Sequence, residues 1–285
     1  MKNLSFCSWV IFLGSFFLLF GCGKKESMTF LPQTEMSGPS QIIGGEEVTS
    51  LTDSIARVTV FIYDSLTQGK CTGTLLGNNF VLTASHCLSS NANSLYVYFT
   101  PNLLTSLKQI PQNIERRKVI AMIPFPMAKA NINNTKNLSD IAIIRYDGIT
   151  PKYYAFASFL PYSQYLKDGA LTVLAGYGAN DGVLKKGSGV LRKVTTPIAS
   201  LQFSQTEVLV EQRKGKGSCH GDSGGPAFLV INNLYYLWGV ASRGYVDTKT
   251  NLKDDCNQFS IYTNVIYYSQ WIKEVMSKIT SQVKQ

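Results

Sequence analysis

The chain has 285 residues, of which 45% are hydrophobic, and this composition excludes a wholly disordered protein and allows a substantial buried core. Tyrosine and phenylalanine are abundant, with 15 of each, and short runs of Val, Ile, Tyr and Thr favour strands over helices. The net charge of +9 comes from scattered basic residues without interleaved aromatic ones, so nucleic-acid recognition is not expected, whereas weak attraction to acidic surfaces stays open.

Residues 1–21 have the pattern of a signal peptide for export. Lys2 precedes an apolar run, Trp9–Phe20, that is shorter than the roughly 20 apolar residues needed to span a membrane comfortably. The run leads into LLFGCGK, which resembles a bacterial lipobox with cleavage before Cys22, although Phe20 is bulkier than that motif usually carries. We expect lipid on Cys22 to anchor the protein in a bacterial cell envelope; an ordinary secretory signal and an uncleaved anchor are the alternatives.

The six cysteines agree with an exported protein. Cys7 would leave with the signal, and Cys22 would carry lipid. Four cysteines then remain, and in an oxidising compartment they are expected to pair as disulfides. The sequence alone allows three pairings among these four residues.

Residues 22–41 are expected to form a lipidated linker or propeptide. From residue 24 onward this stretch carries Pro, Ser, Gly and charged residues without periodicity, which is typical of flexible chain. The folded body should therefore begin near the IIGG sequence at 42–45.

A β-hairpin is predicted at residues 71–87, which read CTGTLLGNNFVLTASHC. Two strand-like runs flank a turn at 77–79, and one of the chain's two histidines, His86, follows the second run. A disulfide between Cys71 and Cys87 would close this hairpin and hold His86 in place. A purely structural histidine beside a cysteine is the alternative.

An aspartate opens an apolar strand in the middle of the chain, where NLSDIAIIRYD places Asp140 directly before residues 141–144. A carboxylate at the start of a buried strand is costly without a partner, and an imidazole N–H would supply one. The alternative is a simple capping role. Four other aspartates lie in more polar settings and are weaker candidates: Asp53, Asp64, Asp147 and Asp168.

A glycine-rich loop at residues 217–226, GSCHGDSGGP, carries a candidate nucleophile. The glycines around Ser223 indicate close backbone approach, although a plain turn is the alternative. A serine hydroxyl becomes a nucleophile only beside a base that a third group orients. His220 is badly placed as that base because it lies three residues from Ser223, so His86 and Asp140 are the candidate partners.

Four stretches in sequence order resemble the signature sequences of trypsin/chymotrypsin-type serine proteases: IIGG at 42–45, TASHC at 83–87, SDIAII at 139–144 and GDSGGP at 221–226. The resemblance covers residues 42 to about 277 and includes LTVLAGYG, ASRG, SIYTNV and a terminal YSQWIKEVM segment. A GDSGG sequence alone would be only fair evidence, whereas three catalytic stretches in the family's order and spacing are specific.

The resemblance implies an all-β fold of two six-stranded antiparallel β-barrels, the chymotrypsin-like double barrel, with a C-terminal α-helix. The N-terminal barrel would comprise residues 42–155, and the C-terminal barrel and helix residues 156–285. A disulfide between Cys219 and Cys256 would brace the serine loop. The expected helix has an apolar face made of Trp271, Ile272, Val275, Met276 and Ile279.

The resemblance also implies catalytic roles. Ser223 would be the nucleophile, His86 the general base and later acid, and Asp140 the carboxylate that orients the imidazole. The backbone N–H groups of Gly221 and Ser223 would form the oxyanion hole. Such an enzyme would hydrolyse protein or peptide substrates through an acyl-enzyme and would need no metal or other cofactor.

The family's activation step is implied for Ile42 and Asp222. Proteolysis before Ile42 would create an α-amino group that pairs with Asp222 and orders the oxyanion loop. Gln41 stands where the family usually has Arg or Lys, so a trypsin-like activating protease would not cut here. Because no disulfide would tether the linker, the cut would also release the body from the membrane. The alternative is that Asp222 is satisfied otherwise and no cleavage is needed.

The floor of the specificity pocket is implied at Gly217, six residues before Ser223. Trypsin-like members carry aspartate there, so glycine would leave a basic substrate side chain desolvated without a partner. We expect cleavage after uncharged side chains, of which medium-to-large apolar ones fit best. The other pocket residues are implied to be Ser218, His220, Ser242, Arg243, Gly244 and Ser260.

Arg243 and His220 are the two cationic candidates of this pocket. Arg243 replaces an aromatic residue common in the family and would favour acidic residues upstream in substrates, while His220 would touch substrate at the rim. A solvated surface position is the favoured interpretation for both residues.

The sequence therefore predicts an exported serine endopeptidase that is monomeric. A non-catalytic envelope binding module that keeps the protease fold is the main alternative, and the complete triad argues against it. A zymogen attached to the envelope for a structural role is a third hypothesis.

Overall fold

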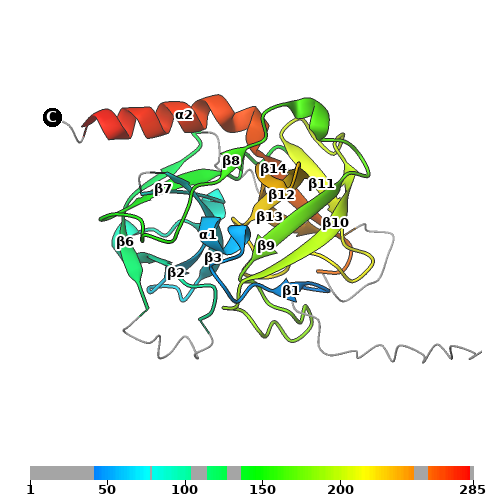
Figure 1. Ribbon diagram of the computed structural model, residues 1–285, viewed down its shortest axis with the longest axis horizontal. Coiled ribbons are helices and arrows are strands. Elements are labelled where there is room, and N and C mark those ends of the chain that lie inside the picture. Colours follow the sequence, from blue (N-terminus) through cyan, green and yellow to red (C-terminus); the bar gives the residue numbers. More distant parts are fainter. Residues whose placement is uncertain (1–41, 78, 104–113, 127–135, 247–255, 283–285) are drawn as a thin grey trace, which may run out of the picture. The chain divides into compact units, whose positions relative to one another are not determined.

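The computed structural model describes residues 42–77, 79–103, 114–126, 136–246 and 256–282 (Figure 1). The predictions for the signal peptide, lipidated Cys22, the linker and Gln41 lie outside the described residues. In the described part of the chain, no helix is both long enough and apolar enough to cross a membrane.

The first barrel closes six antiparallel strands in the order β2-β3-β4-β7-β6-β5. A short helix, α1 (Ser54–Val58), precedes it and is capped by Asp53, whose carboxylate accepts from the Ile55 amide at 2.8 Å. The predicted hairpin at 71–87 forms β3 and β4. The six strands are β2 (Thr59–Asp64), β3 (Lys70–Gly77), β4 (Phe80–Thr83), β5 (Leu95–Tyr98), β6 (Arg116–Pro124) and β7 (Ala142–Tyr146).

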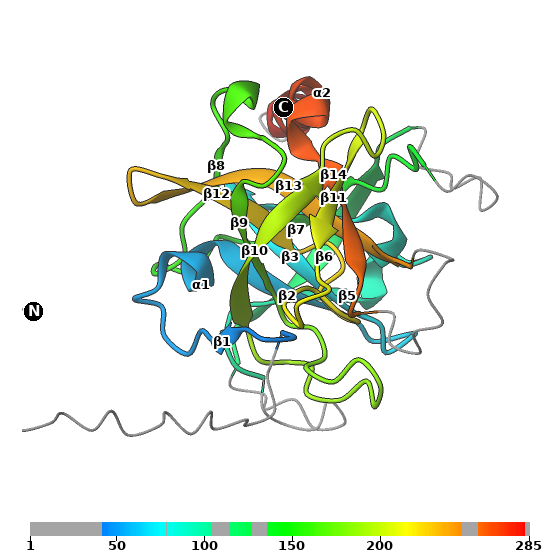
Figure 2. The ribbon, with the colours of Figure 1, turned by 90° about the vertical axis from the view of Figure 1, so that its right-hand side faces the viewer.

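The second barrel faces the viewer in Figure 2 and closes because β9 pairs with both β10 and β12. The ring runs β9-β10-β11-β14-β13-β12, while β1 (Glu46–Glu47) joins β10 and β8 (Ser158–Phe159) joins β13 from outside it. Its strands are β9 (Leu171–Gly176), β10 (Arg192–Ser200), β11 (Glu207–Glu211), β12 (Pro226–Ile231), β13 (Leu234–Tyr245) and β14 (Phe259–Asn264). The predicted double barrel, followed by helix α2 (Val265–Gln282), is confirmed.

Two terminal segments cross from one barrel to the other. Ile42 is buried in the core of the second barrel, and β1 pairs with β10 of that barrel. Helix α2 places Tyr268 and Ile272 in the core cluster that fills the first barrel and extends to β9, β12 and β13 of the second, and the helix lies along the first barrel in Figure 1. Ring contacts from Phe125 to Tyr268, with centroids 4.9 Å apart, fix the helix there. Each segment thus places apolar residues against the barrel that is not nearest to it in sequence, and α2 also contacts β13 of the second barrel.

Candidate active site

His86 and Asp140 meet where two paired strands end. Thr83 of β4 lies opposite Ala142 of β7, so the residues after β4 and before β7 emerge at one edge of the barrel. His86 stands in the one-turn helix η1 (Ser85–Cys87), and its Nδ1 lies 2.7 Å from Asp140 Oδ2. The His86 backbone N–H also donates to Asp140 Oδ1 at 3.1 Å, so the carboxylate binds both the ring and the backbone of this residue.

Residues of the second barrel hold the other side of Asp140. Ser242 Oγ donates to Asp140 Oδ2 at 2.7 Å, and Thr263 Oγ1 donates to the Asp140 carbonyl at 3.0 Å. The Asp140 side chain is only 10% exposed, whereas that of His86 is 47% exposed. The carboxylate is therefore enclosed by donors while the imidazole opens to solvent, as a base that must reach a substrate requires.

The pKa values of this pair favour a carboxylate beside an imidazole that holds a proton more tightly than usual. Burial would raise the pKa of Asp140, but hydrogen bonds from His86 and Ser242 outweigh it and hold that pKa below 3.8. Burial would lower the pKa of His86, but the hydrogen bond and charge of Asp140 raise it above 6.5, against the opposing charge of Arg243. Asp140 thus stays ionised at neutral pH and keeps the Nδ1 proton toward itself, which leaves Nε2 as the basic nitrogen.

The serine loop docks against the first barrel beside η1. The Thr72 amide donates to the Ser223 carbonyl at 2.8 Å, and Sγ of Cys87 lies 3.6 Å from the same oxygen. Gly224 permits this approach, because its φ is +80° and a Cβ there would overlap the Thr72 carbonyl oxygen. Within the described residues the Ser223 hydroxyl makes no hydrogen bond to His86, a contact that often forms fully only in a substrate complex.

Two backbone amides of this loop have no acceptor in the described part of the chain. They belong to Gly221 and Ser223, whereas the amide of Asp222 between them donates to the Cys219 carbonyl at 3.0 Å. Gly221 has a φ of +98°, and its carbonyl accepts from Thr72 Oγ1 at 3.0 Å, which fixes the orientation of the adjoining peptide. Neighbouring N–H groups that are free to donate are what the stabilisation of an oxyanion requires.

Asp222 is fully buried and accepts backbone hydrogen bonds from Gly178 at 2.7 Å and from Cys219 at 2.8 Å. Burial raises the pKa of Asp222 to about 6, and these hydrogen bonds, with the charge of Arg192, offset that cost only in part. Residue 178 must lack a side chain, since a Cβ there would meet the carboxylate. A carboxylate with a raised pKa destabilises the folded chain at neutral pH unless a further cation approaches it.

Ile42 is completely buried, and its backbone is strained. Its φ of 34° lies in the left-handed region, which β-branched residues rarely adopt. The adjacent Ile43 pairs with Gly217, whose amide donates to the Ile43 carbonyl at 2.9 Å. Tyr262 belongs to the same core cluster as Ile42, and its pKa is raised by burial and further by the Asp222 charge.

A cavity of about 250 Å³ lies beside Ser223. The Cys219–Cys256 disulfide forms part of its wall. His220 is exposed, as expected, but Arg243 departs from the expected solvated position because it forms an ion pair with a buried glutamate. Five residues predicted for the pocket line this cavity: Ser218, His220, Ser242, Arg243 and Gly244.

A family model described as Trypsin matches residues 42–272, most of the chain. The chain belongs to the trypsin family. Its relatives include the CLIP domain-containing serine protease B15 of Anopheles gambiae, which is 26% identical over 236 residues, covering 74% of this chain and 62% of that protein. Coagulation factor IX of Oryctolagus cuniculus is 26% identical over 254 residues, covering 81% of this chain and 83% of that protein. Chymotrypsin of Phaedon cochleariae is 26% identical over 254 residues, covering 85% of this chain and 84% of that protein.

The chain therefore carries a trypsin-family serine protease domain, and it spans less than two thirds of the length of the first of these relatives. The three relatives come from two insects and a rabbit, and they carry no information on a bacterial envelope. The region matched begins at Ile42, the first residue that the structure describes.

Both disulfides of this trypsin-family domain join the predicted pairs, Cys71–Cys87 and Cys219–Cys256. Each pair has a histidine nearby, with a ring nitrogen and both sulfurs within 4.8 Å of one another. Cysteine binds metal ions as a thiolate, and a sulfur in a disulfide is not one. These two disulfides therefore hold together loops of the candidate site, and the clusters do not offer sets of metal ligands.

Gly217 and Ser260 do not line the cavity, unlike the other predicted pocket residues. A Cβ on Gly217 would overlap the side chain of Gln212, which is buried behind the cavity wall. Gln212 Nε2 donates to the carbonyls of Ser218 at 3.0 Å and Cys256 at 2.8 Å, and its Oε1 accepts from the Ser218 amide at 2.9 Å. Gln212 thus occupies the place that sequence comparison assigns to a side chain at the pocket floor, and no local pattern marks it.

Gly217→Asp should not create cleavage after Lys or Arg, although aspartate is the residue that trypsin-like members carry there. The new side chain would collide with Gln212 and leave polar groups unpaired, so we expect the free energy of unfolding to fall by about 3 kcal/mol or more. Urea unfolding and cleavage of a mixed peptide library measure the two effects. Gly217→Asp/Gln212→Gly is the matched control, because it vacates the space; efficient Lys or Arg cleavage by Gly217→Asp alone would contradict the assignment of Gln212.

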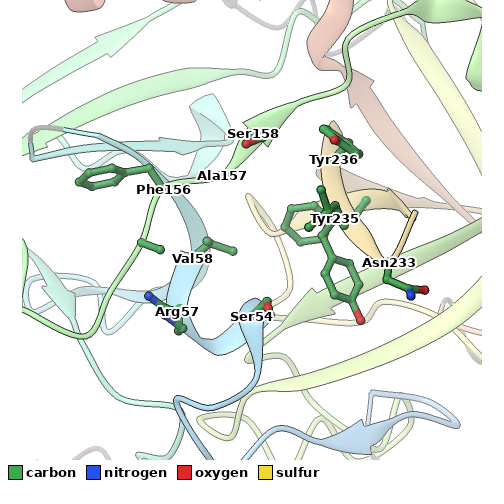
Figure 3. A pocket seen from close by; sticks show the side chains of 12 residues that line it. Ser54, Arg57, Val58, Phe156, Ala157, Ser158, Asn233, Tyr235 and Tyr236 are labelled. Carbon is green, nitrogen blue, oxygen red and sulfur yellow. The ribbon is translucent and has the colours of Figure 1, made fainter. Parts of the chain in front are cut away.

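A second cavity, of about 210 Å³, lies between α1, the segment 155–158 and the β12–β13 hairpin (Figure 3). The side chains of Phe156, Tyr235 and Tyr236 surround it. Arg57, whose Nε donates to the Tyr153 carbonyl at 3.1 Å, is its charged member among the described residues. The cavity contains none of the groups of the His86 site, so it is not the place where chemistry is expected.

Proposed function

We propose that this protein is a serine endopeptidase in which Ser223, His86 and Asp140 form a catalytic triad. The observation that carries the proposal is the His86–Asp140 pair, enclosed by donors from the second barrel and set beside a serine loop with two unpaired amides. Protein or peptide would be the substrate, in keeping with the serine proteases among its relatives.

The geometry supports a two-step acyl transfer. Ser223 Oγ would attack the scissile carbonyl while His86 Nε2 takes the hydroxyl proton, and the negative oxygen that forms would accept from the Gly221 and Ser223 amides. His86 would then give this proton to the leaving amine, which leaves an acyl group on Ser223. Water, deprotonated by the same nitrogen, would release the acid. Asp140 would remain ionised throughout and stabilise the imidazolium.

A fluorophosphonate probe should label the wild-type chain on one residue, and Ser223→Ala should abolish the labelling. The probe reacts with a serine only when a base activates it, so it distinguishes an enzyme from a binding module that merely keeps the fold. Mass spectrometry of the labelled peptide identifies the site. Ser218→Ala is the matched control, because it lines the same cavity; absence of labelling in a correctly folded chain that begins at Ile42 would favour the non-catalytic module.

For substrates, we infer cleavage after uncharged side chains, with medium-to-large apolar ones preferred. The described residues that line the cavity beside Ser223 include the cationic Arg243 and no carboxylate, which supports entry of uncharged rather than basic side chains. The peptide library used for Gly217→Asp reports this preference for the wild type. Dominant cleavage after basic residues would contradict it.

For activation, we propose a cut between Gln41 and Ile42. The strain at Ile42 supports this, because φ is defined by the preceding carbonyl carbon and an N-terminal residue has no φ to restrain. A residue held in a sparsely populated region of backbone φ and ψ angles destabilises the fold by about 1–3 kcal/mol, and the cut would remove this strain. The new α-amino group would be created next to a core that already buries the Ile42 side chain.

For location, we propose that the protein is exported as a bacterial lipoprotein through lipid on Cys22, that the body is monomeric, and that the cut at Ile42 releases it. The lipobox-like sequence and the absence of cysteine between Cys22 and Ile42 support this order of events. Mass analysis of the Cys22 peptide and fractionation of cells examine the two steps. Unmodified Cys22, or an Ile42-initiated form that stays in the membrane fraction, would contradict them.

A further inference from the structure

Glu207, at the start of β11, is a buried carboxylate that the triad does not use. Its side chain is 0% exposed, and Arg243 Nη1 donates to its Oε1 at 2.8 Å. Its Oε2 accepts from the Asn137 amide at 2.8 Å, and the Leu138 amide donates to Oε1 at 3.3 Å. A charge this deeply buried persists only when its partners surround it, and here the partners come from both barrels.

Glu207 holds the segment that delivers Asp140. Asn137 and Ser139 have φ values of 58° and 50°, so this segment of the first barrel adopts a backbone that side chains disfavour. Contacts from the second barrel and α2 keep it in place: Glu207 binds the Asn137 amide, and the Tyr268 hydroxyl donates to Ser139 Oγ at 2.9 Å. The position of the Asp140 carboxylate is therefore determined by residues remote from it in sequence.

Arg243, on β13, carries the same network to the carboxylate itself. Its Nη1 lies 3.1 Å from Ser242 Oγ, and this hydroxyl donates to Asp140 Oδ2 at 2.7 Å. Donation by Arg243 orients the hydroxyl so that its proton points toward Asp140. A continuous series of contacts thus leads from Glu207 through Arg243 and Ser242 to Asp140 and His86.

We propose that the Glu207–Arg243 ion pair is a positioning device that holds the Asp140 loop and sets the proton affinity of the catalytic imidazole. This inference rests on the proposed function for the meaning of His86 and Asp140. Arg243 brings a positive charge close to the triad, and Glu207 neutralises it. Removal of either partner would change the local charge by one unit, with opposite sign in the two cases.

The titratable groups around the network are few in the part of the chain that the structure describes. Asp140, in the loop before β7, and Arg243, on β13, act on the pKa of His86 in opposite directions. Near Glu207 the structure places Arg243 and, on α2, Tyr268, whose pKa is raised by burial and in small part by the Glu207 charge. The ion pair therefore affects the pKa of His86 chiefly through the positive charge of Arg243, which Glu207 offsets.

The test is the pKa of His86, measured by NMR in Glu207→Gln, Arg243→Gln and Glu207→Gln/Arg243→Gln. The chain has two histidines, so His220→Gln assigns the signals. Glu207→Gln should lower the pKa of His86 by about half a pKa unit or more, because the negative charge that Glu207 sets against Arg243 is removed. Arg243→Gln should raise it, and the double variant should return close to the wild type, a sign pattern that simple loosening of the structure would not produce.

Glu211→Gln is the matched control, because Glu211 lies on the same strand and pairs with exposed Arg213. It should leave the pKa of His86 unchanged. If Glu207→Gln does not fold, Arg243→Lys and Arg243→Gln carry the test: lysine keeps the charge and should give the smaller shift. Shifts of the same sign in both single variants, or none, would overturn the proposal.

The acid limb of the kcat/KM profile should move with the pKa of His86 in every variant that turns over substrate. The NMR titration does not need turnover. A chain that begins at Ile42 and shows the opposite shifts but no labelling by a fluorophosphonate would refute the proposed function and leave the ion-pair inference standing. A chain that is labelled but shows no shifts would support the proposed function and refute the ion-pair inference.

Discussion

Asp140→Asn should lower kcat by about 10⁴-fold and leave both barrels folded, which is the size known for this change in the family's template enzyme. The Asp140 carboxylate accepts from the His86 ring, the His86 backbone and the Ser242 hydroxyl. An asparagine amide would present a donor on one side, so the imidazole would keep its proton on Nε2. That nitrogen could then no longer accept the Ser223 proton.

Asp147→Asn is the matched control for this variant. Asp147 follows the other end of β7, and its carboxylate accepts from the Gly148 amide, far from the imidazole. Rates should stay within about two-fold of the wild type, because surface changes of this kind are nearly neutral. A loss of kcat of less than ten-fold in Asp140→Asn, measured with a fluorogenic peptide, would show that Asp140 does not orient the base.

The pH dependence gives an independent reading of the same variant. Because the folded pKa of Asp140 lies below 3.8, its contribution to the free energy of unfolding is present above about pH 4 and is lost as the pH falls through the folded pKa. In Asp140→Asn this contribution is absent, so the free energy of unfolding should fall less steeply as the pH is lowered below about 4. The acid limb of its residual activity should also move to lower pH, because the cause of the raised His86 pKa has been removed.

The strand ends and the serine loop could be predicted from sequence because their residues carry local signals. Apolar runs mark β4 and β7, so a histidine after the first and an aspartate before the second stand at recognisable ends. Gly221 and Gly224 have φ values of +98° and +80°, and such positions favour glycine strongly enough to show in the sequence. The assignment of roles still required the resemblance to a family.

Gln212 and Glu207 could not be predicted, and Arg243 could be predicted only as a pocket residue and not as the partner of Glu207. Their partners are distant in sequence, and no local pattern distinguishes them from exposed polar residues. Glu207 contacts Arg243 across 36 positions and Asn137 across 70. The crossing of Ile42 and α2 between barrels has the same origin, since an apolar face specifies burial but not the surface that covers it. Gly217 shows what the sequence could not reveal: its position predicts the floor of the pocket, but the side chain of Gln212 occupies the space beside it.

A chain that begins at Ile42 should cleave peptides about 10²–10³-fold faster than a chain that keeps residues 22–41, because a buried carboxylate would gain its cation. In the uncut chain the pKa of Asp222 is about 6, above its ordinary 3.8. Between pH 3.8 and pH 6 the folded chain therefore keeps this carboxyl protonated, while the unfolded chain loses the proton. Its free energy of unfolding should therefore fall by about 3 kcal/mol as the pH rises from 4 to 6. Above pH 6 the charged carboxylate would weaken the order of the loop that carries the Gly221 and Ser223 amides.

Matched controls separate the α-amino group from the mere loss of the linker. A chain that begins at Gln41 carries an amino group one residue too early and should behave like the uncut chain, while Asp222→Asn should abolish both the rate advantage of the Ile42 chain and the fall in stability between pH 4 and 6. The measurements are kcat/KM with a fluorogenic peptide and urea unfolding across that pH range. Equal rates for the chains that begin at Ile42 and Gln41 would mean that Asp222 is satisfied by Gly178, Cys219 and Arg192 alone, and activation would then need no cut.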